Sequence, residues 1–358
     1  MQEIPVLSAR YAPQPAGVAW PTSDWPEATS GAPRALAEAV DEAFSDPRLG
    51  TTNVVLVVRA GQILVERYDG VQEFFDRDPE PITASSRLLS WSMAKSILHM
   101  IVGTLVDDGR LDPAQRARVA EWDNASDPRY AITTADLLAM RDGLAFVEKY
   151  EIGQPSDVID MLFGDGRHDV ADYAVRLPLA HAPGTVFNYS SGTTNIISRV
   201  VADEVGRAED YRRYLHERLF APLGMQSAEA TFDDAGVFVA SSYVHATARD
   251  FAKFGLLYLR GGQWGDRQLI SRAWTDTAQV PLSVDVDSDH FYSWQWWLNA
   301  DPYGTYWAAG YEGQMICVVP GLDALIVRFG HTPHESYPAL YEWRRRVIDA
   351  LATTQAPS

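Results

Sequence analysis

Apolar positions follow a two-residue period near both ends of the chain and a helical period between them. Residues 33–45 (PRALAEAVDEAFS) carry apolar side chains at helical spacing and predict a helix. Two β-branched runs follow, NVVLVV and QILVERY, and the break between them at Ala60 and Gly61 predicts a hairpin. Strand patterns return late, in FYSWQWWL, TYWAAGY, QMICVVP and ALIVRF. A helical pattern over residues 338–351 predicts a final helix. Its three arginines, at 344–346, are expected to face water.

The middle of the chain, over about residues 92–259, has a mainly helical pattern. Shorter helices are expected at residues 134–140 and 194–205, and Thr247 followed by Asp250 has the form of a capping box. The first helix has one apolar face, made of Met93, Ile97, Leu98, Ile101, Val102 and Leu105. Strands at both ends around a helical middle indicate an α+β fold, in which an antiparallel sheet is flanked by the terminal helices and an all-α region is inserted.

Three parts of the chain are expected from this pattern. Residues 1–32 are rich in Pro, Ser and Ala without a sustained period and predict an extended arm over the surface. Residues 33–90 and 262–358 are expected to form one α/β sheet domain, and residues 91–261 a mainly helical domain. The groove between the sheet and the inserted helices is the expected site.

Composition and charge narrow the classes of partner. A formal net charge of −18 over 358 residues would repel nucleic-acid phosphates and anionic lipid, so we expect neither nucleic acid nor a membrane as a partner. Cys317 is the only cysteine, which excludes an internal disulfide and a thiolate metal cluster. His331 and His334 lack a further placed ligand, so we expect no metal and no other cofactor. The N-terminus shows no secretory pattern, and the longest apolar stretch, residues 97–106, is too short to cross a bilayer. These features predict a soluble cytoplasmic protein.

Candidate chemistry begins at Ser92-Met93-Ala94-Lys95, which matches the S-x-x-K motif of active-site-serine acylases. Side chains three residues apart on a helix share a face, and the backbone N–H of a serine in the first turn is free to stabilise an oxyanion. Burial can lower the pKa of lysine from about 10.4 toward 7, whereas an arginine stays protonated. Only three of the 30 basic residues are lysines. The alternative, an ordinary helix start whose Lys95 reaches water, stays open at this point.

Two later segments could complete such a site. Tyr189, in FNYSSG, could act as a second general base or carry a proton to the leaving group, provided that a cation such as Lys95 lowers its pKa from about 10. The alternative is a packed aromatic side chain. The AAGY segment at residues 308–311 lies between two predicted strands, where Gly310 would let a substrate carbonyl approach and the N–H of Tyr311 could be the second oxyanion donor. Here the alternative is a simple hairpin turn.

Five segments in a fixed order carry a family resemblance: SMAK, LLAMRDGL, PGTVFNYSSG, ATARDFAKFG and AAGYEGQMICVVP. Together they resemble the class C β-lactamase and family VIII esterase group over about residues 50–330. Within that group the chain is most similar to the 6-aminohexanoate-dimer hydrolases, which cleave small linear amides. The resemblance implies a β-lactamase and penicillin-binding-protein-like fold. It also implies that Ser92 is the nucleophile, Lys95 the base, Tyr189 the second member of the proton relay, Tyr150 a loop residue that closes over the substrate, and Trp297 a wall of the pocket.

Two departures from the family pattern bear on the substrate. Ser191 replaces the asparagine of the usual Tyr-x-Asn motif, an amide that would help to orient an acylamino side chain. Ala308-Ala309-Gly310 stands in place of Lys-Thr-Gly and lacks the cation that would hold a substrate carboxylate. We expect Ser191 and Gly310 to contact substrate all the same. Both departures favour a neutral or aromatic ester or amide over a β-lactam.

The sequence therefore predicts a serine hydrolase that cleaves small linear amides or esters through an acyl-enzyme on Ser92, with weak or absent β-lactamase activity. The expected partner is a small amide or ester, and a homodimer is left open. Three alternatives remain: a carboxylesterase or transesterase without amidase activity, a sensor or binding protein that is acylated without turnover, and a catalytically dead homologue.

Overall fold

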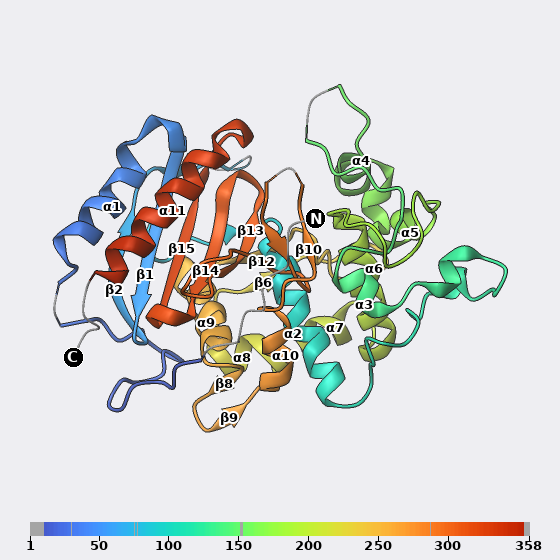
Figure 1. Cartoon of the computed structure of the whole chain (residues 1–358), viewed down its shortest axis with the longest axis horizontal. Helices are drawn as coiled ribbons and strands as arrows, with labels where there is room; N and C mark the ends of the chain where they lie inside the picture. Colours follow the sequence, from blue (N-terminus) through green and yellow to red (C-terminus); the bar gives the residue numbers. More distant parts are fainter. Residues whose placement is uncertain are drawn as a thin grey trace.

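One antiparallel sheet of eight strands forms the centre of the fold, and its strands come from both ends of the chain (Figure 1). The computed structural model describes residues 11–29, 31–74, 76, 78–150, 153–286 and 288–353. In spatial order the strands are β10 (Ser283–Val284), β11 (Phe291–Tyr292), β12 (Trp297–Leu298), β13 (Tyr306–Gly310), β14 (Gln314–Val319), β15 (Ala324–His331), β1 (Thr51–Arg59) and β2 (Gln62–Tyr68). β1 therefore pairs with β15, and Val54 lies opposite Phe329. The predicted α+β class and antiparallel sheet are confirmed.

Helices lie on both sides of this sheet and beyond one of its ends (Figure 1). In chain order they are α1 (Arg34–Ser45), α2 (Met93–Asp107), α3 (Thr134–Leu138), α4 (Asp157–Phe163), α5 (Val170–Val175), α6 (Ser191–Val205), α7 (Glu209–Leu215), α8 (Ala221–Leu223), α9 (Ala248–Leu259), α10 (Arg272–Thr277) and α11 (Tyr337–Ala352). α6 begins three residues before the predicted helix at 194–205, because the Ser190 hydroxyl caps it by accepting from the N–H of Thr193. Thr247 caps α9 in the same way, as the sequence predicts.

Short two- and three-stranded sheets accompany the main one. β5 (Leu88–Leu89), β7 (Val244–Ala246) and β6 (Glu229–Ala230) form one of them, and β5 leads directly into the start of α2. The other two sheets are hairpins, made of β3 (Val71–Gln72) with β4 (Glu80–Pro81) and of β8 (Gln263–Trp264) with β9 (Arg267–Gln268).

Successive side chains of the central strands point to opposite faces, so each strand contributes to two separate cores. On β1, Val54, Leu56 and Val58 belong to the core shared with α2 and α9. Val55 and Val57 belong to the core under α1 and α11. Neither face of this strand meets water, which explains the unbroken apolar run in its sequence.

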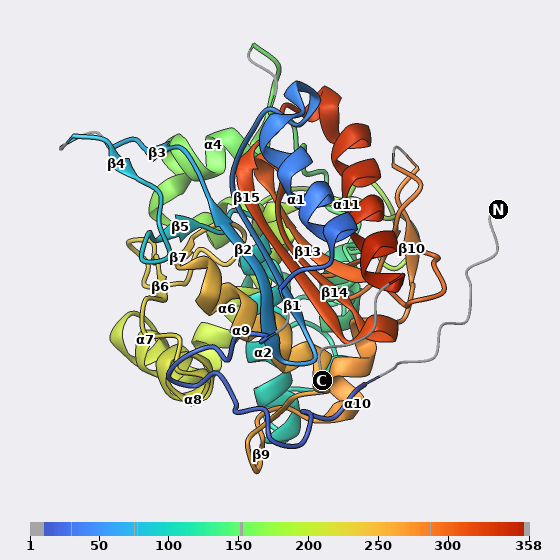
Figure 2. The same cartoon turned by 90° about the vertical axis from the view of Figure 1, so that its left-hand side faces the viewer.

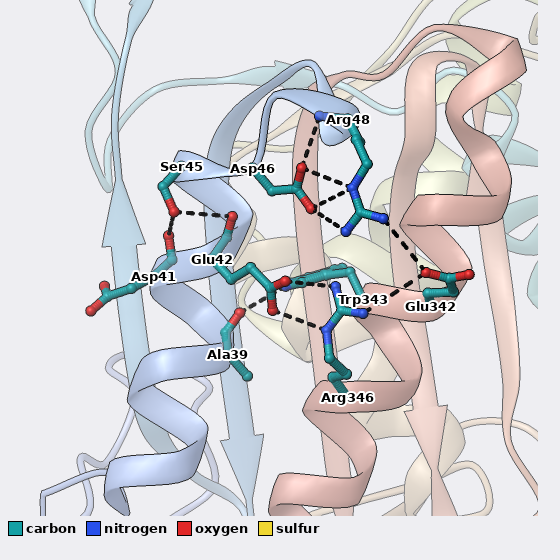
Figure 3. Close-up of polar contacts among 9 residues, drawn as sticks. All are labelled: Ala39, Asp41, Glu42, Ser45, Asp46, Arg48, Glu342, Trp343 and Arg346. Carbon is teal, nitrogen blue, oxygen red and sulfur yellow. Dashed lines mark hydrogen bonds and ion pairs between the residues drawn. The ribbon is translucent and has the colours of Figure 1, made fainter.

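α1 and α11 lie side by side across one face of the sheet (Figure 2). The indole N–H of Trp343 donates to the backbone carbonyl of Ala39 at 2.8 Å, and the Arg346 guanidinium binds both carboxylate oxygens of Glu42 at 2.9 Å (Figure 3). These contacts join the first helix to the last, so both ends of the chain stabilise the same layer.

The expectation that all three arginines of α11 face water is wrong for Arg344. This side chain is 2% exposed, and its guanidinium lies 3.8 Å from the ring centre of Trp307 on β13. Residue 344 lies one helical turn from Leu340 and from Ile348, on the buried face of α11. A cation over an aromatic ring keeps part of its stabilisation when it is buried, so arginine is tolerated there.

α2 lies between the sheet and the helices beyond it, and for this reason it is buried on nearly every side (Figure 1). Its apolar residues join the core that also contains α6 and α9. His99, within α2, is fully buried and hydrogen-bonded through its two ring nitrogens to the hydroxyls of Tyr258 and Thr277. Burial lowers the pKa of His99 to about 3, so it is neutral and has a structural role.

The pattern FYSWQWWL forms two short strands rather than one. β11 and β12 pair with Tyr292 opposite Trp297, and the chain reverses at Gln295, whose φ is 59°. The buried amide of Gln295 donates to the Leu138 carbonyl at 3.0 Å and accepts from the Thr194 hydroxyl at 2.9 Å. These contacts with the helical region stabilise the reversal, and they are long-range features that a local sequence pattern does not contain.

The N-terminal part that the structure describes, residues 11–29, runs as coil and turns over the surface. Tyr11 donates to Asp276 at 2.6 Å, and the Trp25 indole donates to the Arg249 carbonyl at 3.0 Å. Residues 1–10 of the predicted arm lie outside the described residues. The division of the chain into domains stays a prediction. Within the described ranges, no helix has the length and apolar character needed to cross a membrane.

Candidate active site

Ser92 stands at the N-terminus of α2, directly after an unusual turn. Trp91 has a φ of 44°, which is rare for a bulky side chain, and Ser92 follows as the helix cap. Ser90 is fixed to the small sheet, since its N–H donates to the Val244 carbonyl at 2.8 Å and its hydroxyl to the Ser242 carbonyl at 3.2 Å. These bonds hold the turn in place, and the Ser92 side chain remains partly exposed.

Lys95 lies one helical turn further along α2, as the S-x-x-K spacing predicts. Its Nζ atom is 2.9 Å from the Ser92 hydroxyl, 3.0 Å from the Ser191 hydroxyl and 3.0 Å from the Ser241 carbonyl. All three partners are uncharged, and the side chain is 2% exposed. Burial therefore lowers the pKa of the Lys95 amine to about 8, while the Glu148 carboxylate acts against this shift. The alternative in which Lys95 reaches water is excluded.

Tyr189 lies beside Lys95, on the segment that leads into α6. The neighbouring Asn188 anchors this segment through its N–H, which donates to the Met140 carbonyl at 2.9 Å. The Tyr189 ring packs against Trp297 at 5.4 Å and against Tyr292 at 5.9 Å, measured between ring centres. Trp297, a predicted wall of the pocket, is thus in direct contact with the predicted relay tyrosine.

The pKa of Tyr189 moves in the direction opposite to that required for a second base. Burial raises it well above its usual value, the Glu148 carboxylate raises it further, and the Ser92 hydroxyl acts the other way. A Lys95 cation was expected to lower the pKa of Tyr189. It does not do so, because the same burial disfavours the charged form of the lysine. Tyr189 is therefore a protonated phenol at neutral pH. Its role in a proton relay stays a prediction.

Ser191, the first residue of α6, is fully buried behind Lys95. Its hydroxyl lies between the Lys95 amine and the Glu148 carboxylate, to which it donates at 2.7 Å. Its backbone N–H also donates to Glu148, at 2.7 Å. In this structure Ser191 supports Lys95 from behind rather than facing open space.

Glu148 is the residue of this cluster that the sequence analysis missed. It lies in the irregular segment between α3 and α4, and its carboxylate accepts from Ser191 and from the Tyr150 hydroxyl, the latter at 2.6 Å. No motif or period marks it in the sequence. The proximity of EKY to the predicted residue Tyr150 was the one available signal.

The turn after β13 faces the start of α2. A Cβ on Gly310 would lie 2.4 Å from the Ser90 carbonyl oxygen, so the glycine is needed for the contact between the strand and the serine turn. Its predicted contact with substrate stays a prediction. The Tyr311 ring packs edge-on to Trp91 at 5.6 Å and lies 4.7 Å from the ring of Tyr150, which is 40% exposed. Tyr150 therefore lies at the surface of the cluster.

Two buried side chains hold the Tyr311 turn. Gln314 donates to the Tyr311 carbonyl at 2.9 Å and exchanges two hydrogen bonds with the backbone of Gly330 on β15. The Arg328 guanidinium donates to the carbonyls of Glu312 and Gly313 at 3.1 and 3.0 Å. The backbone of the turn is thus fixed to the sheet.

Within the described residues, neither the backbone N–H of Ser92 nor that of Tyr311 donates a hydrogen bond to another part of the chain. The following N–H groups of α2 do have acceptors, such as Met93, which bonds to the Ser90 carbonyl at 3.2 Å. An oxyanion hole needs two free donors aimed at one point, so the predicted role of these N–H groups stays a prediction.

No metal-binding arrangement of His, Cys, Asp and Glu side chains occurs in the described ranges. Two surface cavities of about 510 and 490 Å³ lie elsewhere, one beside Asp127 and Arg129 and the other between α1 and α11. Neither is lined by Ser92 or its partners. The chemistry of its side chains, and not a large cavity, distinguishes the cluster around Ser92.

Ser92, Lys95 and Tyr189 meet at the junction of an antiparallel sheet with a helical region. This fold and this cluster define a serine hydrolase of the class related to penicillin-recognising enzymes. The family described as Beta-lactamase matches residues 46–350, and the chain belongs to this family.

Individual relatives agree with this assignment. A 6-aminohexanoate-dimer hydrolase of Paenarthrobacter ureafaciens is 28% identical over 302 residues, which cover 79% of this chain and 73% of the relative. A D-aminopeptidase of Cereibacter sphaeroides is 28% identical over 200 residues, but this match spans only 37% of that protein. Among solved structures, a Bacillus anthracis protein described as a 6-aminohexanoate-dimer hydrolase has a TM-score of 0.72 at 20% identity, over 96% of this chain and 90% of that one. This structural likeness shows the shared fold.

Proposed function

We propose that this protein hydrolyses small linear amides or esters through an acyl-enzyme on Ser92. The observation that carries the proposal is the 2.9 Å contact between the Ser92 hydroxyl and the amine of Lys95, whose pKa burial lowers to about 8. A lysine in this state is a base within reach of the serine proton at neutral to mildly alkaline pH.

In the first step, the neutral Lys95 amine takes the proton of Ser92 while the serine oxygen attacks the substrate carbonyl. The N–H groups of Ser92 and Tyr311 stabilise the oxyanion of the tetrahedral intermediate. The C–N or C–O bond of the substrate then breaks as the Tyr189 phenol protonates the leaving group. The Lys95 ammonium returns its proton to Tyr189, so Lys95 is neutral again when the acyl-enzyme has formed.

Water completes the reaction through the same groups. Lys95 takes a proton from a water molecule while the water oxygen attacks the acyl carbonyl. The proton then passes from Lys95 to the Ser92 oxygen when the ester bond breaks. The products are a carboxylic acid and the free serine. No step requires a metal or an organic cofactor.

The expected substrate is a neutral or aromatic acyl compound. One side of the cluster is formed by aromatic rings, among them Tyr189, Tyr292 and Trp297. The strand opposite Ser92 carries Ala308-Ala309-Gly310 and thus no ammonium group for a substrate carboxylate. Relatives named as a 6-aminohexanoate-dimer hydrolase and as a D-aminopeptidase support amide hydrolysis.

Substitution of the serine tests this proposal. Ser92→Ala should lose hydrolysis of a p-nitrophenyl acyl ester and labelling by a fluorophosphonate probe, while Ser85→Ala, at an exposed serine, should retain both. Wild-type turnover by Ser92→Ala would show the assignment to be wrong. Intact-mass measurement with a slow substrate should reveal a transient adduct, and an adduct that persists without product would instead indicate an acylated sensor.

The choice between amidase and esterase needs a matched pair of substrates with one acyl group and either an amine or an alcohol as leaving group. We expect turnover of both, and negligible turnover of a chromogenic cephalosporin. Loss of the amide reaction alone would leave a carboxylesterase or transesterase.

A further inference from the structure

Glu148 receives more hydrogen bonds at the site than any role in the mechanism above requires. Its Oε2 atom accepts from the Ser191 backbone N–H, and its Oε1 atom accepts from the Ser191 hydroxyl, both at 2.7 Å. The same Oε1 atom accepts from the Tyr150 hydroxyl at 2.6 Å. One carboxylate thus joins the surface tyrosine to the first residue of α6.

The link continues to the nucleophile. The Ser191 hydroxyl that donates to Glu148 also accepts from the Lys95 amine at 3.0 Å, and that amine lies 2.9 Å from the Ser92 hydroxyl. The hydroxyl of Ser191 can donate only one proton, and Glu148 takes it. This fixes the lone pairs of Ser191 toward Lys95, which is the orientation that holds the amine in place.

We propose that Glu148 is a positioning residue, whose carboxylate orients Ser191 and Tyr150 and, through Ser191, places the Lys95 amine beside Ser92. This inference rests on the hydrolase mechanism proposed above. In this role the Glu148 carboxylate does not contact the reacting atoms. The site then includes a fourth residue besides Ser92, Lys95 and Tyr189.

The carboxylate also acts on Lys95 through space. Because the Ser191 hydroxyl lies 3.0 Å from Lys95 Nζ and 2.7 Å from Glu148 Oε1, these two atoms are at most about 5.7 Å apart. At such a distance in a buried site an opposite charge favours the protonated lysine, which agrees with the effect of Glu148 on the Lys95 pKa.

The other titratable groups that face Glu148 are tyrosines on three different segments. They are Tyr150 on its own loop, Tyr189 before α6 and Tyr292 on β11, and the Glu148 carboxylate raises the pKa of each. All three stay neutral at pH 8, so Lys95 is the group whose charge responds to Glu148 in the working range.

The test is the pH dependence of two rates in Glu148→Gln. One is kcat/KM for a p-nitrophenyl ester, and the other is the rate of fluorophosphonate labelling. Removing the negative charge should move the acid limb of both profiles to lower pH by about one unit. The amide also offers Ser191 a donor in place of one acceptor, so the plateau rate should fall about tenfold. A residue with a merely structural role would lower the folded fraction without moving the limb.

Glu121→Gln is the matched control. Glu121 also anchors α6, since both its carboxylate oxygens accept from Arg199, but it has no contact with Lys95 or Ser191. We expect its acid limb to coincide with that of the wild type. Tyr150→Phe removes only the hydrogen bond from Tyr150 to Glu148. The acid limb of its pH profile should likewise coincide with that of the wild type.

Ser191→Ala tests the same link without touching the charge, and it serves if Glu148→Gln does not fold. It should lower the plateau rate of labelling about tenfold. A wild-type plateau for Ser191→Ala, or an unmoved acid limb for folded Glu148→Gln, would overturn the inference. These outcomes differ from failure of the proposed function, in which Ser92→Ala would remain active.

Discussion

The amine of Lys95 lies over the ring of Tyr189, with Nζ 4.8 Å from the ring centre. Burial shifts the pKa values of these neighbours in opposite directions, downward to about 8 for Lys95 and upward for Tyr189. One group can therefore accept a proton at a pH at which the other still holds its own. This separation supports the proposed roles of Lys95 as the base and Tyr189 as the acid.

The first prediction concerns the pH dependence of catalysis. Below pH 8 Lys95 is protonated in the free enzyme and cannot take the proton of Ser92, so kcat/KM should fall tenfold per pH unit on the acid side, with an apparent pKa of about 8. Lys95→Arg should be inactive throughout, because a guanidinium stays protonated. A rate that is flat from pH 6 to pH 9 would exclude Lys95 as the base.

The second prediction separates the roles of Tyr189. Tyr189→Phe keeps the packing with Trp297 and Tyr292 but removes the proton donor, so the rate of amide hydrolysis should fall about 10²- to 10⁴-fold. A p-nitrophenolate leaving group needs no proton, and its release should suffer far less. Equal losses on matched amide and p-nitrophenyl ester substrates would contradict the role as acid, and a thermal unfolding scan checks that the fold is retained.

The third prediction tests the contact between the sheet and the serine turn. In Gly310→Ala the added methyl group would lie 2.4 Å from the Ser90 carbonyl oxygen, so β13 and the start of α2 must move apart. We expect a loss of about 1 to 3 kcal/mol in the free energy of unfolding and a lower kcat. Gly31→Ala is the control, because its methyl group meets nothing within 4 Å. Unchanged activity in Gly310→Ala would argue that the separation of these segments does not matter for catalysis.

The fourth prediction concerns stability. Asp142 is 4% exposed and accepts from the Leu144 N–H and the Thr193 hydroxyl, and burial raises its pKa to about 6. A carboxyl whose folded-state pKa is raised contributes stability below its unfolded pKa near 4, and this contribution is lost as the pH rises through 6. Asp142→Asn lacks this titration.

Urea unfolding measures the effect. The stability of Asp142→Asn relative to the wild type should increase by on the order of 1 to 3 kcal/mol between pH 4 and pH 7.5. The lost acceptor for Thr193 or Leu144 adds a cost that does not depend on pH. A difference that is independent of pH would show that Asp142 does not titrate in this range.

Local patterns in the sequence are sufficient to predict the hairpin, the terminal helices and the position of Lys95 beside Ser92. In each case the determining spacing lies within a few residues, and period 2 or the helical i, i+3 relation fixes the geometry. Tyr189 is a candidate from its place in the FNYSSG loop, and the family resemblance adds Trp297; the structure brings both to the cluster.

Other features depend on contacts between distant segments, and the sequence does not display them. Glu148 reaches Ser191 from an irregular segment, and no period marks that approach. The need for glycine at position 310 comes from the Ser90 carbonyl of another element. Arg344 is buried because an aromatic ring of β13 lies beneath it, which a count of charged residues on a helix does not reveal.

The pairing of β1 with β15 has a consequence for synthesis of the chain. Val54 is synthesised well before its partner Phe329, and until Phe329 is made the edge of β1 that pairs with β15 stays open. Long-range pairings of this kind form slowly and expose the nascent chain to aggregation. A chain whose translation stops between β1 and β15 would therefore keep this edge of the sheet open.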